Sequence, residues 1–326
     1  MRLFSIVIPV YNRPDEVKEL LESLTKQHYS NFEVLIIEDG SKDTCESIVT
    51  SFSEHLDIHY YFKENTGQGF TRNYGFERAK GDYYIVFDSD CLIPADYLTE
   101  VNAFLDTNPV DAFGGPDKAH ESFNTLQKAI SYSMTSPFTT GGIRGNKKHV
   151  GRFHPRSFNM GISKAVFEKT GGYKLTRMGE DIEFSIRIIN ADYKTALIPN
   201  AFVYHKRRTS LGQFYKQLHF FGRARVNVNR YCKGELKPVH LLPLVFFLAF
   251  WSWLSTPYWY YPLFKVGAVL VGFYYTAIFL DSLIKNKNLK VAFTSILTSF
   301  VQLYAYGMGL ISEVISPRGN QPFAQK

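Results

Sequence analysis

Cysteine is scarce in this sequence, which has three among its 326 residues. Cys45, Cys91 and Cys232 show no metal-binding spacing, and an odd number of scattered cysteines is typical of a reduced compartment that needs no disulfide framework. The N-terminal segment also lacks the small-residue cleavage site of a signal peptide. Its apolar run leads directly into a polar stretch, so we expect a first β-strand there, in a domain that stays in the cytosol.

Two common phosphate-binding motifs are absent as well. The sequence has no G-x-x-x-x-G-K-S/T, which excludes a P-loop, and no G-x-G-x-x-G follows the first predicted strand, which argues against a dinucleotide-binding domain. The net charge of +7 does not indicate nucleic-acid binding, because nine lysines and arginines crowd into residues 206–237, directly before the apolar C-terminal region. A basic stretch in that position is typical of contact with anionic lipid at a membrane surface.

Long apolar runs, by contrast, dominate the C-terminal part. Residues 241–261, 263–284 and 291–315 form three stretches of about 20 residues, the length that a bilayer requires. We interpret them as membrane segments rich in interfacial Trp and Tyr; a hydrophobic helical core is the alternative. Pro243 and Pro257 allow the first segment to be bent or re-entrant. Lysines between the second and third segments favour a multi-pass inner or plasma membrane protein with a cytoplasmic N-terminal domain.

The first 200 residues alternate strand and helix patterns, most clearly up to residue 90. Apolar, β-branched and aromatic runs predict strands, and apolar residues at helical spacing predict helices between them. The strands are expected at 4–10, 32–39, 58–63 and 83–90, and the helices at 15–27, 43–52 and 69–79. Strict alternation predicts a largely parallel sheet with helices on both faces, in which ligands bind beyond the carboxyl ends of the strands.

Paired carboxylates end the fourth predicted strand. Asp88 and Asp90 are two positions apart, so on an extended chain their side chains share one face and repel each other unless a positive charge lies between them. A hard divalent cation is the obvious candidate; a turn in which the short side chains bond to nearby backbone is the alternative. Further residues near the strand ends indicate a site for a nucleotide diphosphate: Pro9, Tyr11, Asp39 and Arg72.

Five stretches, taken in order, resemble the inverting family 2 glycosyltransferases. They are SIVIPVYNRPDEVKELLESL, VLIIEDGSKDT, TGQGFTRNYGFERAKGDYYIVFDSD, FNMGISKAVFEKTGGY and GEDIEFSIRI, and they lie within residues 3–210. The resemblance implies an α/β domain of the GT-A fold with a Rossmann-like mixed sheet, followed here by C-terminal transmembrane helices. It also implies a nucleotide-diphosphate sugar as donor, with a UDP-sugar favoured, and Mg²⁺ or Mn²⁺ as the metal.

The resemblance assigns roles on the donor side of the site. Asp90 would bind the metal, Asp88 would lie near the ribose, and Asp39 would hydrogen-bond the edge of the base between Pro9 and Tyr11. Arg72 would lie near the nucleotide. Two simpler alternatives stay open at this point: Asp39 caps the turn at Gly40, or Arg72 is a solvated charge on its helix.

The acceptor side is assigned in the same way. The family places a Glu-Asp pair at the start of a helix, here Glu180 and Asp181, where Asp181 would be the general base that deprotonates the attacking hydroxyl. Acidic residues in a first helical turn are also ordinary partners of the helix dipole. Asn159 and Gly161 would line the donor sugar. His205 would complete the metal site or be structural. No Gln-x-x-Arg-Trp occurs, which disfavours a processive polymerase.

The sequence therefore predicts a metal-dependent inverting glycosyltransferase. It would move a sugar to a hydroxyl of a lipid-linked or other glycan acceptor at the cytoplasmic face of the membrane. We expect a catalytic domain over 1–210, a basic juxtamembrane segment over 211–240, a membrane region over 241–316 and a tail over 317–326. The alternatives are another sugar-nucleotide enzyme, either a nucleotidyltransferase or a hydrolase, and an inactive membrane scaffold of the same fold.

Overall fold

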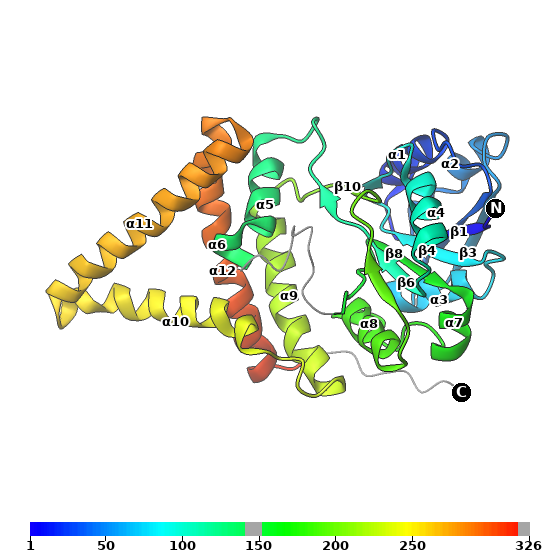
Figure 1. Ribbon diagram of the computed structural model, residues 1–326. Helices are drawn as coiled ribbons and strands as arrows, with labels where there is room; N and C mark the ends of the chain where they lie inside the picture. Colours follow the sequence, from blue (N-terminus) through cyan, green and yellow to red (C-terminus); the bar gives the residue numbers. More distant parts are fainter. Residues whose placement is uncertain (141–151, 319–326) are drawn as a thin grey trace. The chain divides into compact units, whose positions relative to one another are not determined.

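A computed structural model describes residues 1–140 and 152–318 (Figure 1). Its contacts divide these residues into two compact units. The α/β unit comprises residues 1–118 and 152–206, and the helical unit comprises residues 119–140 and 207–318. Residues 119–140 thus group with helices that follow them by more than 70 positions. The sequence did not predict this grouping.

The α/β unit is built on a mixed seven-stranded sheet of order β3-β2-β1-β4-β8-β6-β9. The first four strands in this order are parallel, as predicted, whereas β8 runs antiparallel to both of its neighbours. The mixed sheet of the predicted fold is therefore confirmed. The strands are β1 (Phe4–Val10), β2 (Phe32–Asp39), β3 (Ile58–Lys63), β4 (Tyr83–Phe87), β6 (Ala112–Gly114), β8 (Asn159–Ser163) and β9 (Thr195–Leu197).

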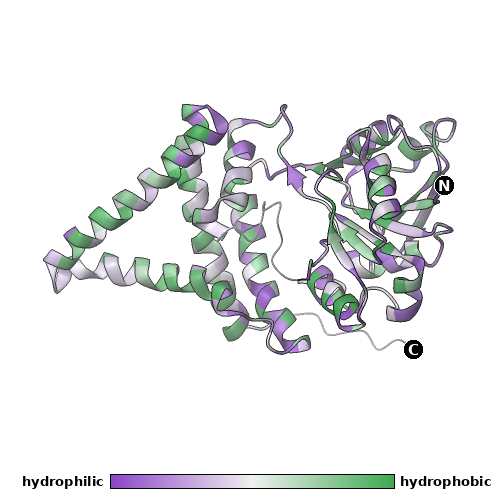
Figure 2. Ribbon diagram, viewed as in Figure 1, coloured by the Kyte–Doolittle hydropathy of each residue, from purple (hydrophilic) through white to green (hydrophobic). Residues whose placement is uncertain are grey.

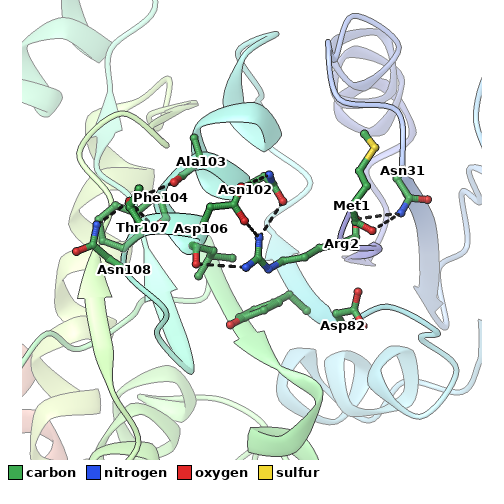
Figure 3. Close-up of polar contacts among 12 residues, drawn as sticks. Met1, Arg2, Asn31, Asp82, Asn102, Ala103, Phe104, Asp106, Thr107 and Asn108 are labelled. Atoms are coloured by element: carbon green, nitrogen blue, oxygen red, sulfur yellow. Dashed lines mark hydrogen bonds and ion pairs between the residues drawn. The ribbon is translucent and has the colours of Figure 1, made fainter.

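Helices cover both faces of this sheet, and each face has its own apolar core. One core includes buried residues of α1, α2 and α4, and the other includes buried residues of α3, α7 and α8. At the N-terminus Arg2 pairs with Asn102 and Asp106 of α4 (Figure 3). The helices are α1 (Pro14–Leu24), α2 (Glu46–Ser51), α3 (Gln68–Phe76), α4 (Tyr97–Thr107), α7 (Lys164–Thr170) and α8 (Glu180–Asn190).

A small three-stranded sheet of order β5-β10-β7 extends the α/β unit. Its strands are β5 (Cys91–Leu92), β7 (Asp117–Lys118) and β10 (Val203–His205). In this sheet His205 is the partner of Cys91. Because Cys91 directly follows Asp90, this pairing brings His205 close to Asp90, which lies 115 positions earlier in the sequence.

The helical unit contains three helices that are long and apolar enough to cross a membrane, at Pro238–Tyr258, Tyr261–Asn286 and Leu289–Ile315 (Figure 2). The prolines of the first span lie in the first turns of its helical pieces, where a missing N–H costs little. The elements are α5 (Thr125–Thr135), α6 (Pro137–Thr140), α9 (Leu211–Tyr231), η1 (Pro238–Leu241), α10 (Leu242–Ser255), η2 (Thr256–Tyr258), α11 (Tyr261–Asn286) and α12 (Leu289–Ile315).

Among the three apolar helices, α12 differs in its packing. Half of its most apolar window is buried within the protein, against 6% for each of the other two spans. A Cβ atom on Gly309 of α12 would lie 2.1 Å from the carbonyl oxygen of His219 in α9, so the two helix backbones touch at this glycine. On another side, Ser133 of α5 hydrogen-bonds Thr298 at 2.6 Å. Helix α12 is thus a candidate membrane helix that packs against other helices of this unit far more than the other two candidate spans do.

Candidate active site

The Asp-Ser-Asp segment follows the carboxyl end of β4. It does form a turn, in which the N–H of Cys91 donates to the carbonyl oxygen of Asp88 at 3.1 Å. The two carboxylates have different basic partners among the described side chains. Asp88 pairs with Arg72, and Asp90 pairs with Arg13 and His205. The protein therefore separates the two negative charges that the sequence places side by side.

Asp90 is buried between two basic side chains. Its Oδ2 accepts a hydrogen bond from Nη1 of Arg13 at 2.9 Å, and its Oδ1 lies 3.1 Å from Nε2 of His205. The ring of Phe158 stacks on the imidazole with the two centroids 5.2 Å apart, which fixes its orientation. Sequence analysis predicted the pair of Asp90 and His205 but missed Arg13, because an arginine after a strand has no distinguishing pattern.

These side chains fit a divalent metal in their donor chemistry. One carboxylate oxygen of Asp90, one ring nitrogen of His205 and the sulfur of Cys91 all lie within 4.8 Å of one another. Carboxylates suit Mg²⁺ and Mn²⁺, and imidazole suits transition metals, so this donor set fits a divalent ion without selecting one. Burial raises the pKa of the Cys91 thiol well above its ordinary value, which keeps it protonated and unsuited to a hard cation.

Arg72 projects from α3 into the protein, where 1% of its surface is exposed. Its Nη2 donates to Asp88 at 2.9 Å and its Nη1 donates to Glu180 at 3.2 Å. Burial alone lowers the pKa of Arg72, but Tyr173 and the two carboxylates raise it above the ordinary value. The alternative of a solvated helix charge is thus excluded by burial, and Arg72 links β4 to the start of α8.

The Glu-Asp pair occupies the first turn of α8, after Gly179 with a φ of 97°. Glu180 is buried and accepts hydrogen bonds from Gln68 and Arg72. Burial, together with the charge of Asp181, raises the pKa of the Glu180 carboxyl. Glu180 is therefore more deeply buried than Asp181, its neighbour in the sequence.

Asp181 is the more accessible member of this pair. Its side chain is 20% exposed, Oδ1 accepts from the N–H of Ile182 at 2.8 Å, and Oδ2 lies 3.5 Å from Nη1 of Arg156. Sequence analysis also missed Arg156, because a single arginine shortly before a strand has no distinguishing pattern either. A partly exposed carboxylate beside a guanidinium can accept a proton from a bound hydroxyl.

Asp39 lies at the carboxyl end of β2 and organises the loop before α3. Its carboxylate accepts from the backbone N–H groups of Thr66 and Gly67, both at 3.0 Å, and from Nζ of Lys63 at 2.5 Å. These contacts reach the loop before α3, so Asp39 does more than cap the turn at Gly40. Pro9 is half-buried at the end of β1 and Tyr11 is exposed beyond it, so contact of these residues with a base stays a prediction.

Asn159 and Gly161 lie on β8, where the structure gives each of them a packing role. The side chain of Asn159 accepts from the hydroxyl of Tyr97 at 2.5 Å and donates to the carbonyl oxygen of Ala201 at 2.8 Å. A Cβ atom on Gly161 would lie 2.0 Å from the ring of Phe113, which explains why this position requires glycine. Their proposed contact with a donor sugar stays a prediction.

Known proteins resemble the chain in sequence. Residues 5–171 match the family described as Glycosyl transferase family 2. An uncharacterized glycosyltransferase of Rickettsia typhi is 41% identical over 127 residues, which are 38% of this chain and 39% of that protein. The chain covers between 13% and 39% of the lengths of four such Rickettsia relatives. The dolichyl N-acetyl-alpha-D-glucosaminyl phosphate 3-beta-D-2,3-diacetamido-2,3-dideoxy-beta-D-glucuronosyltransferase of Methanococcus voltae is 25% identical over 99% of this chain and 100% of that protein.

A solved structure resembles the fold. The mannosyltransferase PcManGT from Pyrobaculum calidifontis, in complex with GDP-Man and Mn2+, superposes with a TM-score of 0.68 at 18% identity. The alignment covers 97% of this chain and 88% of that chain. At this identity the likeness shows the GT-A fold, as predicted. Because the family match itself covers half of the sequence, the chain belongs to glycosyltransferase family 2.

Proposed function

We propose that this glycosyltransferase is metal-dependent and inverting, and that it transfers a sugar from a nucleotide-diphosphate donor to a hydroxyl of a lipid-linked glycan. One observation carries the proposal. The carboxylates of the candidate site are divided between two environments, with Asp90 beside His205 and Asp181, on α8, beside Arg156. A metal-binding pair and a separate proton acceptor are what a single in-line displacement at the anomeric carbon requires.

Asp90 and His205 would hold the metal, which we propose is Mn²⁺ or Mg²⁺. When bound, the ion supplies electrostatic stabilisation of the departing diphosphate. The complex of the mannosyltransferase with GDP-Man and Mn2+ supports a nucleotide-diphosphate donor and a divalent ion here. A UDP-sugar is our preferred donor, with Asp39, Pro9 and Tyr11 at the base and Asp88 at the ribose.

The chain's own residues would then carry the proton and orient the groups. Asp181 accepts the proton of the acceptor hydroxyl while the new bond to the anomeric carbon forms and the bond to the diphosphate oxygen breaks. Arg156, 3.5 Å from Asp181, orients its carboxylate toward the acceptor. One terminal nitrogen of Arg72 pairs with Asp88 and the other pairs with Glu180, so we propose that Arg72 positions Asp88 for the nucleotide.

We propose a lipid-linked acceptor and a cytoplasmic catalytic unit. Three helices long enough to cross a membrane, preceded by the nine basic residues of 206–237, fit a multi-pass anchor with its basic side in the cytoplasm. The Methanococcus voltae relative is named for a dolichyl phosphate substrate, which supports a lipid-linked acceptor of this class. We propose residues 1–210 as the catalytic domain, 211–240 as the juxtamembrane segment, 241–316 as the membrane region and 317–326 as the tail.

The test separates binding from chemistry at Asp181. First, a panel of UDP- and GDP-sugars with Mn²⁺ identifies the donor by thermal stabilisation of the full-length protein. Asp181→Asn should then bind that donor normally but transfer the sugar to a polyprenyl-phosphate-linked acceptor about 10²- to 10⁴-fold more slowly, because proton acceptance is removed.

The matched control is Asp192→Asn. Asp192 also belongs to an arginine–aspartate pair, with Arg152 at 3.4 Å, but it is exposed beyond the other end of α8. Its transfer rate should stay unchanged. Parental transfer rates in Asp181→Asn would show that the Glu-Asp pair is a helix-start feature. A chain that consumes donor without acceptor would instead be a hydrolase, and one that binds donor without turnover would be a scaffold.

A further inference from the structure

A second charged cluster lies at the opposite edge of the parallel strands. Glu33 is the second residue of β2, His59 is the second residue of β3, and Asp57 directly precedes β3. Because β2 and β3 are parallel, all three residues lie at the amino end of the sheet. Asp88 and Asp90, by contrast, follow the carboxyl end of β4. The proposed donor site therefore does not use this cluster.

Glu33 is a carboxylate with one oxygen hydrogen-bonded and one not. Its Oε1 accepts from the hydroxyl of Ser5 at 2.6 Å and from the N–H of Lys80 at 2.7 Å. The side chain is 1% exposed, so Oε2 is buried, yet Oε2 accepts no hydrogen bond from any residue that the structure describes. Burying a carboxylate oxygen without a hydrogen-bond donor is costly, so a cation bound at Oε2 would stabilise it.

His59 faces that oxygen. Its Nε2 lies 3.7 Å from Oε2 of Glu33 and 3.2 Å from Oδ1 of Asp57, yet it makes no hydrogen bond to the described residues. The three ligand atoms all lie within 4.8 Å of one another. Two ligands bound tetrahedrally to one Zn²⁺ at their usual distances are about 3.4 Å apart, so these separations suit a single ion.

We propose that Glu33, Asp57 and His59 form a second divalent-metal site, of the class that accepts imidazole and carboxylate together, such as Zn²⁺. Water would complete the coordination, because the side chains of His59 and Asp57 are 33% and 63% exposed and leave one side open. The ion would fasten the edge strand β3 to β2. Its role is structural and does not depend on the reaction at Asp181.

A competing cation is present in the side chain of Lys80. Its Nζ lies 3.9 Å from Oε2 of Glu33, outside hydrogen-bonding distance, and the side chain is 68% exposed. Such a flexible, strongly hydrated ammonium can move into water when a metal binds. Alternatively, His59 and Lys80 pair with the two carboxylates without any metal, and metal analysis distinguishes these two arrangements.

Zinc binding by the full-length protein tests the proposal. Asp90→Asn serves as the reference chain, because it removes the predicted metal ligand of the donor site. After equilibrium dialysis we expect one Zn²⁺ per reference chain, and at least tenfold weaker binding when His59→Gln or Asp57→Asn is added. Both of these side chains are partly exposed, so the variants should fold normally by circular dichroism.

Two further variants sharpen the outcome. Glu33→Gln retains an oxygen for the bonds from Ser5 and Lys80 but loses the charge at Oε2, and it should also lose the Zn²⁺. His28→Gln removes the imidazole of an exposed histidine–aspartate pair with Asp96, and it should bind Zn²⁺ like the reference. The proposal is overturned if the reference chain binds no Zn²⁺, or if His59→Gln or Glu33→Gln binds it with unchanged affinity.

Discussion

The two units each contain an ion triad around a buried central side chain, and the two triads have opposite charge patterns. In the α/β unit one cation, Arg72, is bonded to the carboxylates of Asp88 and Glu180. In the helical unit one anion, Glu313 of α12, is bonded to Arg223 and Arg230 of α9. Both central side chains are almost completely buried, at 1% and 0% exposure.

The triads differ in how completely their hydrogen-bonding capacity is used. Glu313 accepts from Arg223 at 2.8 Å and from Arg230 at 2.5 Å, and the backbone N–H of Arg318 donates to both of its oxygens. Arg72, in contrast, has a buried Nε without an acceptor among the described residues, and its partner Asp88 is 33% exposed.

This difference indicates that the two triads have different roles. A carboxylate with every oxygen occupied fixes α12 to α9. A guanidinium with a remaining donor and a partly exposed partner can adjust when a ligand binds. Unsatisfied buried groups of this kind are expected at functional sites.

The largest expected effect follows from breaking the saturated triad. Glu313→Gln keeps the side-chain shape but leaves two arginines near a neutral amide, and loss of one partner of a buried pair costs about 3–5 kcal/mol. We expect a correspondingly large fall in the unfolding free energy of the detergent-purified protein, measured by thermal or chemical unfolding.

The control for this variant is an exposed ion pair of the same unit. Lys237→Gln removes a partner 4.0 Å from Glu235, and exposed pairs contribute at most about 1 kcal/mol. Equal stability losses in Glu313→Gln and Lys237→Gln would contradict the view that the triad holds α9 and α12 together.

A smaller effect is expected from Arg72→Lys, which keeps the charge in the other triad. A lysine ammonium cannot span both carboxylates as the guanidinium does, so one charged hydrogen bond should be lost, at about 1.5–3 kcal/mol. Donor affinity should fall as well, because Asp88 loses its orienting partner. Reduced stability with unchanged donor affinity in a calorimetric titration would assign Arg72 a purely structural role.

The sequence predicted one of these triads in part and the other not at all. Arg72, Asp88 and Glu180 belong to stretches that resemble a known family, so each was identified, although their mutual pairing was not. Glu313 is a single acid near the end of an apolar run, and its arginine partners lie some 80 to 90 positions away. A local pattern does not carry such a long-range pairing.

The same reasoning applies to the elements of the fold. β1, β2 and β3 end where predicted, because buried β-branched runs bounded by polar residues define strands locally. The antiparallel course of β8 and the packing of α5 on α12 were not predicted. Both depend on partners distant in sequence, as the hydrogen bond between Ser133 and Thr298 illustrates.

The smallest effect concerns the pH dependence of the Arg72 triad. Burial and the charge of Asp181 raise the pKa of Glu180, so the folded protein holds this proton to a higher pH than the unfolded chain does. The stability contributed by protonation is therefore fully present below the unfolded pKa and is lost as pH rises through the folded pKa.

Glu180→Gln should lack this loss, so the difference in unfolding free energy, variant minus parent, should increase with pH and then level off. Its slope cannot exceed about 1.4 kcal/mol per pH unit for one proton. Denaturant unfolding across the acidic range measures this difference, and a difference that decreases with pH would show that attraction to Arg72 outweighs burial at this carboxylate.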